Sequence, residues 1–294
     1  MCRMVALRFD RRALGVAKTL IDSLVEASAD DPYLRKLIGD GRHCHGFGYV
    51  LAGRRGGAWE LTSRRFDAFG EQLVEEEVCE RNLEELRSAA KSLKDALGEY
   101  EEVALAFHTR RTMSEPRGTL NAHPFRAELL LSVDGRPELF ELYLSHNGGV
   151  KKLELAETLG LPGAELMTDS HVLTHYLARS LHGSDVRAVA SRLAGLVSDI
   201  RKRVLSSLDL NLLLFSRLTG PVLVAVGYVT SKDEDRIRYY EPVLVRGEGI
   251  AGYVSSTIRD LIVERGLGLE VRSSREGFVA LFGPGTYELL PVVG

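Results

Sequence analysis

The sequence begins with Met1-Cys2, so removal of the initiator methionine would leave a residue that carries both a thiol and a free α-amine. A thiol is a strong nucleophile only as the thiolate, with a reference pKa near 8.5, and an α-amine has a reference pKa of about 7.7 to 8.0. The amine can therefore accept the thiol proton near neutral pH, which makes Cys2 a candidate nucleophile and base at once. We expect acyl transfer to this thiol.

Four later residues could act on a substrate of that reaction. The side-chain amide of Asn147 and the backbone N–H of Gly148, in the segment HNGG, are suitable donors for a developing oxyanion. Arg110 offers a planar guanidinium for a carboxylate, and Asp169 offers a carboxylate for an ammonium group. Together these groups predict an amino acid substrate whose side chain carries a cleavable amide, and glutamine is the obvious candidate.

Each of these residues also has a plainer interpretation. Cys2 could be a small buried apolar residue in a strand, and residues 110–111 could be a solvated arginine pair. The HNGG segment at 146–149 would then be a turn, and Asp169 would cap the N-terminus of the helix that follows it. His123 would be a loop histidine with structural hydrogen bonds. Taken one at a time, the residues leave both interpretations open.

Hydrophobic periodicity predicts the elements that must position these residues. Helical patterns cover 13–29, 71–97, 170–183 and 184–208. Strand patterns cover 4–9, 102–108, 128–133, 139–145, 210–216, 220–230, 239–246, 249–256 and 277–283, with one more short strand within 39–53. The sequence DGRP at 134–137 predicts a hairpin turn. Strands at both ends with helical blocks between them predict two sheets covered by helices, in an α+β fold.

Four polar or glycine-bearing segments are expected to follow strands and to converge on one cleft, because strand ends present loops from a rigid scaffold. They are CHGFG at 44–48, the stretch 107–125, LSHNGG at 144–149 and LMTDSH at 166–171. We expect residues 1–294 to form one domain. A split near residue 183 is the alternative, but a first half ending there would lack the closing strands.

Composition and charge exclude several classes of function. The net charge is −3, with 38 basic and 41 acidic side chains interleaved, so no field favours nucleic acid or an anionic membrane. The apolar runs are too short for a membrane span, and no h-region of a signal peptide is present. Three cysteines without paired spacing argue against a disulfide framework and a zinc site. We therefore expect reduced thiols, a cytoplasmic location, and no metal or cofactor.

The order of the motifs resembles the class II glutamine amidotransferases, the N-terminal nucleophile hydrolases that begin with cysteine. The matching segments are Met1-Cys2, His108-Thr109-Arg110, Asn121-Ala122-His123-Pro124-Phe125, His146-Asn147-Gly148 and Thr168-Asp169-Ser170. They cover residues 1 to about 180. The final third matches only by its pattern of a long helix, LNLLLFS and YVSS, as in the stand-alone amidotransferase-like proteins.

The resemblance implies a four-layer αββα sandwich and a role for each matched position. Cys2 would be the nucleophile and base, Asn147 and Gly148 would hold the oxyanion, Arg110 would bind the α-carboxylate, and Asp169 would bind the α-ammonium. Supporting positions are His108, Thr109 and His123. The implied activity is a glutaminase reaction through a γ-glutamyl thioester, with ammonia released to an acceptor on a synthase partner protein or to no acceptor.

The sequence departs from the family pattern around the arginine motif. Residues 111–114 read Arg-Thr-Met-Ser, where the enzymes of the family continue with tryptophan, alanine, threonine and histidine. That loop helps to cover glutamine in the family, and His45 and His171 stand where relatives carry acidic residues. Two alternatives therefore stay open. One is an amidohydrolase for γ-glutamyl peptides or other amides, and the other is a glutamine-binding regulatory module with little turnover.

Overall fold

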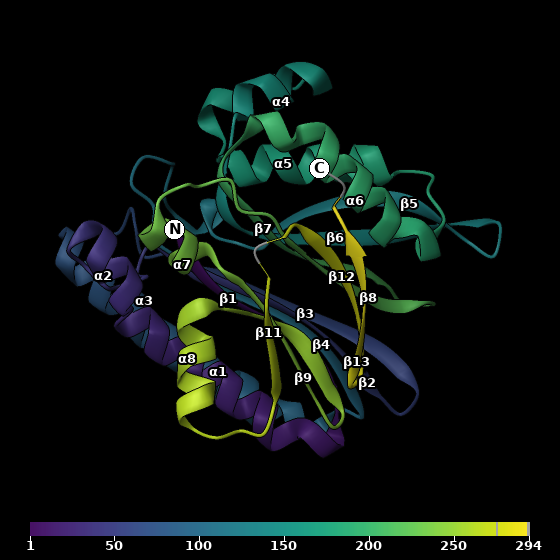
Figure 1. Ribbon diagram of the computed structural model, residues 1–294, viewed down its shortest axis with the longest axis horizontal. Coiled ribbons are helices and arrows are strands. Elements are labelled where there is room, and N and C mark those ends of the chain that lie inside the picture. Colours follow the sequence, from purple (N-terminus) through teal and green to yellow (C-terminus); the bar gives the residue numbers. More distant parts are fainter. Residues whose placement is uncertain (275, 293–294) are drawn as a thin grey trace.

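The computed structural model describes residues 1–274 and 276–292, which build two antiparallel sheets stacked face to face (Figure 1). Along the first sheet the order is β11 (Glu270–Ser273), β9 (Pro242–Gly247), β10 (Ile250–Ser255), β1 (Cys2–Asp10), β4 (Glu102–Arg110), β2 (Phe47–Arg55) and β3 (Ala58–Phe66). In the second sheet the order is β13 (Thr286–Pro291), β12 (Phe278–Gly283), β8 (Gly220–Gly227), β7 (Val204–Ser216), β6 (Arg136–Val150) and β5 (Phe125–Val133). The expected α+β class with two sheets is confirmed.

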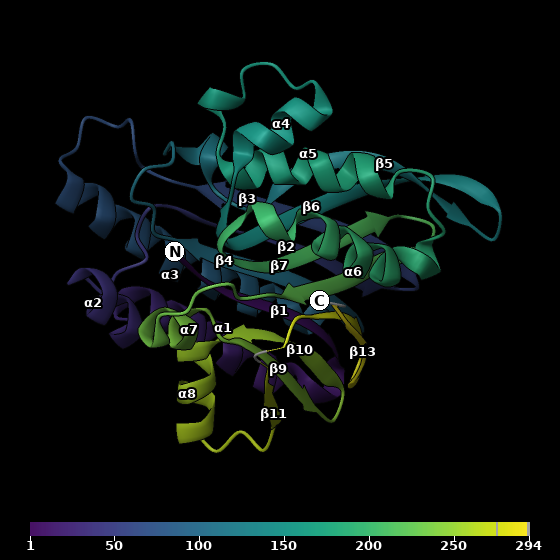
Figure 2. The ribbon, with the colours of Figure 1, turned by 45° about the horizontal axis from the view of Figure 1, so that its top comes forward.

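Helices cover the outer face of each sheet, as Figure 2 shows for α4 and α5 on one side and α1 and α8 on the other. The helices on the first sheet are α1 (Leu14–Ala29), α3 (Glu75–Ala96) and α8 (Ser256–Glu264), with α2 (Pro32–Ile38) packed beside α7 (Glu234–Tyr240) at one end. The second sheet carries α4 (Lys152–Leu159), α5 (Asp169–Leu181) and α6 (Val189–Ile200). Short 3-10 turns occupy Arg11–Ala13, Leu97–Glu99, Thr119–Asn121, Ala164–Leu166, Val186–Ala188 and Arg201–Arg203.

Strand alternation divides the apolar side chains among three layers. In β1, Val5 and Leu7 pack against the helices, whereas Met4 and Ala6 face the second sheet. The sheet-to-sheet layer is completed by residues such as Leu213 of β7. Because successive side chains point to opposite faces, Cys2 lies on the same face of β1 as Met4, between the sheets.

The predicted hairpin is confirmed, since β5 and β6 are joined at Asp134 and Gly135, which both have positive φ. The helix predicted over 184–208 ends at Ile200 instead, and β7 begins at Val204. The helix ends early because Val204 pairs with Val150 at the end of β6. This strand pairing overrides the local helix propensity of residues 204–208. Likewise, the predicted strand at 239–246 begins only at Pro242, because Tyr239 and Tyr240 close helix α7.

Two of the three cysteines are joined, which corrects the expectation of reduced thiols. Cys44 and Cys79 form a disulfide with an S–S distance of 2.02 Å, and Cys2 is free and buried. Their separation of 35 residues has no sequence signature, but α3 packs against the segment before β2 and brings the two thiols together. Because the expected cytoplasmic location rested on reduced thiols, the disulfide removes that reason for it. None of the helices in the described residues is long and apolar enough to cross a membrane.

Candidate active site

Cys2 and Arg110 lie directly opposite each other in the antiparallel ladder of β1 and β4. Opposed residues share a face of the sheet, so both side chains point into the layer between the sheets. Each residue is only 4% exposed. The register of two central strands thus places a thiol beside a guanidinium although 108 positions separate them in the chain (110 − 2).

A cavity of about 180 Å³ opens at this end of the two sheets. Its lining residues are Met1, Cys2, residues 110–115, His123, His146, Gly148, Asp169 and Ser170. Of the residues predicted from sequence, the cavity brings together Cys2, Arg110, His123, Gly148 and Asp169. The other three predicted residues, His108, Thr109 and Asn147, are not among those lining residues.

Three of the four segments contribute lining residues to the cavity, residues 44–48 do not, and only one segment follows a strand as expected. Residues 107–110 end β4, whereas residues 44–48 lead into β2 and residues 166–171 lead into α5. The HNGG segment lies inside β6, which continues to Val150. The strand continues because β7 pairs with it on both sides of a bulge that separates Gly148 from Val150.

Asn147 is engaged with the nucleophile rather than with the open cavity. Its Oδ1 accepts a hydrogen bond from the backbone N–H of Cys2 at 2.9 Å, and its Nδ2 donates to Oδ2 of Asp209 at 3.5 Å. Asn147 and Asp209 are both buried. The amide therefore connects the nitrogen of Cys2, in one sheet, to a buried acid in the other.

Gly148 has no room for a side chain. Its φ is +151°, and a Cβ built on it would lie 1.9 Å from the carbonyl oxygen of Ser207. The close approach of β6 and β7 at this point therefore requires glycine. The same glycine lines the cavity, which leaves its backbone close to any bound substrate.

Arg110 is a buried cation without an anionic partner, so the interpretation as a solvated pair is wrong for it. Its Nη1 donates to the carbonyl oxygen of Pro116 at 2.8 Å, and no carboxylate in the described part of the chain forms an ion pair with it. Burial lowers the pKa of Arg110, and the nearby Cys2 and Asp169 oppose that shift. Arg111, by contrast, pairs with Asp40 at 3.2 Å. Arg110 is thus suited to bind an anion inside the cavity.

Asp169 does not cap helix α5, because Thr168 does so by accepting from the N–H of His171 at 3.1 Å. Asp169 is the first helical residue, and its Oδ2 accepts from the N–H of Val150 at 3.0 Å. Its Oδ1 accepts from the N–H of Ser170 at 2.7 Å. Oδ1 also accepts from the Oγ of Ser170 at 3.2 Å. The helix N-terminus and these donors hold the carboxylate at the cavity wall, where Oδ2 has a further lone pair for a cation.

Three buried histidines surround the cavity and are neutral at pH 7. Burial lowers the pKa of His108 to about 3, and burial also lowers the pKa of His123 and of His146. His146 Nδ1 lies 3.0 Å from the Oγ of Ser170. Neither ring nitrogen of His123 has a hydrogen-bond partner among the described residues, so the expected structural hydrogen bonds are not found there. Its ring centroid lies 4.0 Å from that of His108, with the two ring planes tilted by 36°, which places His108 behind the cavity wall.

Thr109 belongs to the opposite face of β4. Its Oγ1 accepts a hydrogen bond from the Oγ of Ser28 in α1 at 2.8 Å. Alternation along the strand makes this inevitable, since Thr109 lies between His108 and Arg110, which face the second sheet. Thr109 therefore attaches the strand to its covering helix instead of supporting the cavity.

Met1 extends the ladder of β1 and β4 by one residue. Its α-ammonium donates to the carbonyl oxygen of Arg111 at 2.8 Å, and its carbonyl oxygen accepts from the N–H of Arg111 at 2.7 Å. The side chain of Met1 packs against the cluster that contains Tyr239 and Tyr240. While Met1 is present, the nitrogen of Cys2 is a peptide nitrogen and has no lone pair to accept a proton.

Sequence reasoning missed the residues that hold the backbone of Cys2. The hydroxyl of Tyr239 donates to the carbonyl oxygen of Cys2 at 3.1 Å, and Arg3 Nη1 donates to the carbonyl oxygen of Tyr239 at 3.0 Å. Arg3 also forms a fully buried ion pair with Asp31 at 2.6 Å. No signal in the sequence pairs a residue of α7 with the second residue of the chain, because the contact depends on how α7 packs in the folded protein.

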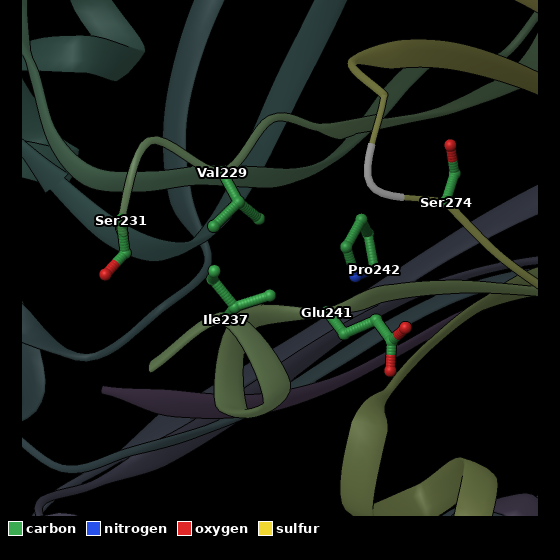
Figure 3. A pocket seen from close by; sticks show the side chains of 6 residues that line it. All are labelled: Val229, Ser231, Ile237, Glu241, Pro242 and Ser274. Atoms are coloured by element: carbon green, nitrogen blue, oxygen red, sulfur yellow. The ribbon is translucent and has the colours of Figure 1, made fainter. Parts of the chain in front are cut away.

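A second cavity, of about 110 Å³, lies between α7 and the segment after β8 (Figure 3). It is lined by Val229, Ser231, Ile237, Glu241, Pro242 and Ser274. Its carboxylate, Glu241, is paired with Arg259. Its other lining side chains are apolar or hydroxyl groups, so this cavity lacks the combination of nucleophile and free cation found around Cys2.

Comparison with known proteins does not assign the chain to a family. No protein-family model matches the sequence, and no curated protein matches it. Within residues 1–274 and 276–292, no group of three or more histidine, cysteine or acidic side chains is arranged to hold a metal ion. The chemistry of this site must therefore be argued from the residues around Cys2.

Proposed function

We propose that the protein is a glutaminase of the class II glutamine amidotransferase type, with Cys2 as its nucleophile after removal of Met1. The observation that supports this most directly is the cavity around Cys2, which joins a buried thiol, an unpaired guanidinium and a carboxylate from three separate segments. A thiol beside a cation and an anion is complementary to an α-amino acid with a cleavable side chain. Two stacked antiparallel sheets with Cys2 at the start of a central strand are compatible with an N-terminal nucleophile hydrolase sandwich.

The reaction divides into two acyl transfers. The freed amine of Cys2 takes the proton of the thiol, and Sγ attacks the side-chain carbonyl carbon of glutamine. The tetrahedral intermediate collapses by breaking the C–N bond, and the nitrogen leaves as ammonia with the proton returned by the amine. Water then adds to the γ-glutamyl thioester and releases glutamate and the free thiol. The ammonia passes to an acceptor on a partner protein or into solution.

The residues around the cavity take complementary roles in this proposal. Arg110 binds the α-carboxylate of glutamine, and Asp169 binds its α-ammonium. The N–H of Gly148 stabilises the oxyanion. Asn147 was expected to share that role, but its oxygen is directed at the nitrogen of Cys2, at 2.9 Å. We assign Asn147 first to holding that nitrogen, so that the lone pair of the freed amine can face the thiol.

Three measurements on one preparation test the proposal. The intact mass should lack Met1, glutamine should release ammonia, and an electrophilic glutamine analogue should add once, to Cys2. Cys2→Ala should abolish both ammonia release and labelling without changing thermal stability. Active protein that retains Met1 would contradict the mechanism. Running γ-glutamyl peptides and N-acyl amino acids in parallel identifies which amide the cavity prefers, since residues 111–115 border it.

A glutamine-binding regulatory module is the second candidate, and the observation that favours it concerns Met1. That residue forms two backbone hydrogen bonds with Arg111 and packs against a buried tyrosine cluster, so it is held like an ordinary structural residue. A protein that retains Met1 would keep the cavity but lack the base. Calorimetric binding of glutamine without ammonia release, in protein whose mass includes Met1, would support this candidate.

A further inference from the structure

Asp209 lies in β7 directly opposite Asn147 of β6, on the face turned toward the first sheet. Further along the same face, Leu213 and Phe215 belong to the apolar layer between the sheets. Near Cys2 the layer becomes polar, and there Asp209 is accompanied by Asn211 and by Ser145. The change from apolar to polar side chains therefore coincides with the position of the nucleophile.

Asp209 is a buried acid without a salt-bridge partner. It is 0% exposed and forms no ion pair with any described residue. The Ser207 hydroxyl and the backbone N–H of Tyr228 lie near its carboxyl and favour the charged form, but Oδ1 makes no hydrogen bond of good geometry with any described residue. The oxygens of Asn211 and Ser145 on the same face also lack partners within the described chain. Burial of an uncompensated acid is destabilising. Because this buried acid lies beside the candidate nucleophile, we infer that Asp209 has a role in the candidate active site.

Burial, more than any neighbouring charge, keeps Asp209 neutral. Burial raises the pKa of its carboxyl well above the usual range. The charged and titratable groups that face it are Arg3 and Cys2 of β1, Tyr240 of α7 and Tyr253 of β10. Even when protonated, the carboxyl still accepts a hydrogen bond through its carbonyl oxygen.

The contact between Asp209 and Asn147 decides which end of the amide faces Cys2. A carboxamide has a donor end and an acceptor end, and it can turn over between two orientations of the same shape. Oδ2 of Asp209 takes the donor end at 3.5 Å, which leaves Oδ1 of Asn147 for the nitrogen of Cys2 at 2.9 Å. With no acceptor at position 209, the amide could present its NH₂ group to that nitrogen instead.

We propose that Asp209 is a positioning residue that holds the oxygen of Asn147 toward the nitrogen of Cys2 and so sets the orientation and proton affinity of the freed amine. This inference rests on the proposed function, because it concerns Cys2 after removal of Met1. An oxygen aimed at the amine favours its protonated form, whereas an NH₂ group favours the unprotonated form. Loss of the acceptor at position 209 therefore lowers the proton affinity of the base.

The test is an NMR titration of processed, full-length protein labelled with ¹³C at cysteine, in which the ¹³Cα signal of Cys2 reports protonation of its amine. The variants are Asp209→Leu, which cannot accept, and Asp209→Asn, which can. Asn211→Leu is the matched control, since Asn211 lies on the same face and does not contact Asn147. In Asp209→Leu the titration midpoint should fall by on the order of one pH unit, a tenfold loss of proton affinity, and kcat should fall about tenfold. Asp209→Asn and Asn211→Leu should keep the wild-type midpoint.

Two results would overturn the inference: an unchanged midpoint in Asp209→Leu, or an equal fall in Asp209→Leu and Asn211→Leu. If Asp209→Leu does not fold, Asp209→Ala tests the same prediction, because the alanine side chain also lacks a hydrogen-bond acceptor. Labelling of Cys2 by the electrophilic glutamine analogue is measured on the same samples. Wild-type protein that is neither labelled nor active would overturn the proposed function, whereas labelled protein with an unchanged midpoint would overturn only the role of Asp209.

Discussion

The backbone nitrogen of Cys2 donates a hydrogen bond to Oδ1 of Asn147 across the space between the two sheets, at 2.9 Å. This contact joins the first strand of one sheet to the middle of the other, so the position of the N-terminus is fixed by both. Tyr239 holds the carbonyl oxygen of the same residue at 3.1 Å. Both polar groups of the Cys2 backbone are therefore satisfied by side chains, and its thiol remains directed into the cavity.

Asn147→Ala should lower kcat for ammonia release by about 10²-fold, the size of loss typical when a group that orients or stabilises the reacting atoms is removed. KM for glutamine should change little, because Asn147 does not line the substrate cavity. Steady-state kinetics should compare kcat and KM of Asn147→Ala with those of Asn211→Ala. The second variant is the control, because it leaves the contact between Asn147 and Cys2 intact. Equal losses in the two variants would mean that the effect comes from the polar layer as a whole.

Arg110→Lys should raise KM for glutamine by about 10- to 100-fold, because a charge-assisted hydrogen bond is worth roughly 1.5–3 kcal/mol. Lysine keeps the charge but loses the planar fork that binds a carboxylate at two points. Glutaminol, which lacks the carboxylate, is the diagnostic substrate, and wild type and Arg110→Lys should use it equally poorly. A variant that loses activity toward glutaminol as well would assign Arg110 a role other than carboxylate binding.

Reduction of the Cys44–Cys79 disulfide should lower the free energy of unfolding by about 2–4 kcal/mol, as expected for a native cross-link. Urea denaturation with and without reductant measures the change, and Cys79→Ala should show the same loss without reductant. Cys2→Ala is the control, because Cys2 is not in the disulfide. Full alkylation of all three thiols in unreduced, denatured protein would show that the bond does not form.

Stability should fall as the pH drops from 7 to 5. His108 is neutral in the folded protein because burial lowers its pKa to about 3, whereas an unfolded histidine titrates near 6.5. The unfolded state therefore binds more protons in this window, and one such histidine removes about 2 kcal/mol of stability between pH 7 and pH 5. Urea denaturation of His108→Gln should show a smaller pH dependence. An equal pH dependence in wild type and His108→Gln would contradict the assignment.

Local signals explain what the sequence predicts well. The Asp134-Gly135 pair predicts the hairpin because both residues tolerate positive φ. Helix α1 follows from apolar residues at Ala17, Leu20 and Leu24, which face the first sheet. The order of the polar motifs likewise predicts four of the residues that line the cavity with Cys2, namely Arg110, His123, Gly148 and Asp169.

Long-range pairing explains what the sequence does not predict. The Cys44–Cys79 disulfide, the start of β7 at Val204 and the contact from Tyr239 to Cys2 all depend on which elements become neighbours. Asp209 carries no motif, and it falls between the helix predicted over 184–208 and the strand predicted over 210–216. Only its register opposite Asn147 reveals a relation to the nucleophile.

Ammonia release from glutamine, measured on wild type and Cys2→Ala whose intact masses are known, tests the central proposal most directly. We expect a wild-type mass without Met1, ammonia release by the wild type, and none by Cys2→Ala. Equal ammonia release by the two proteins, or release by wild type that retains Met1, would contradict it.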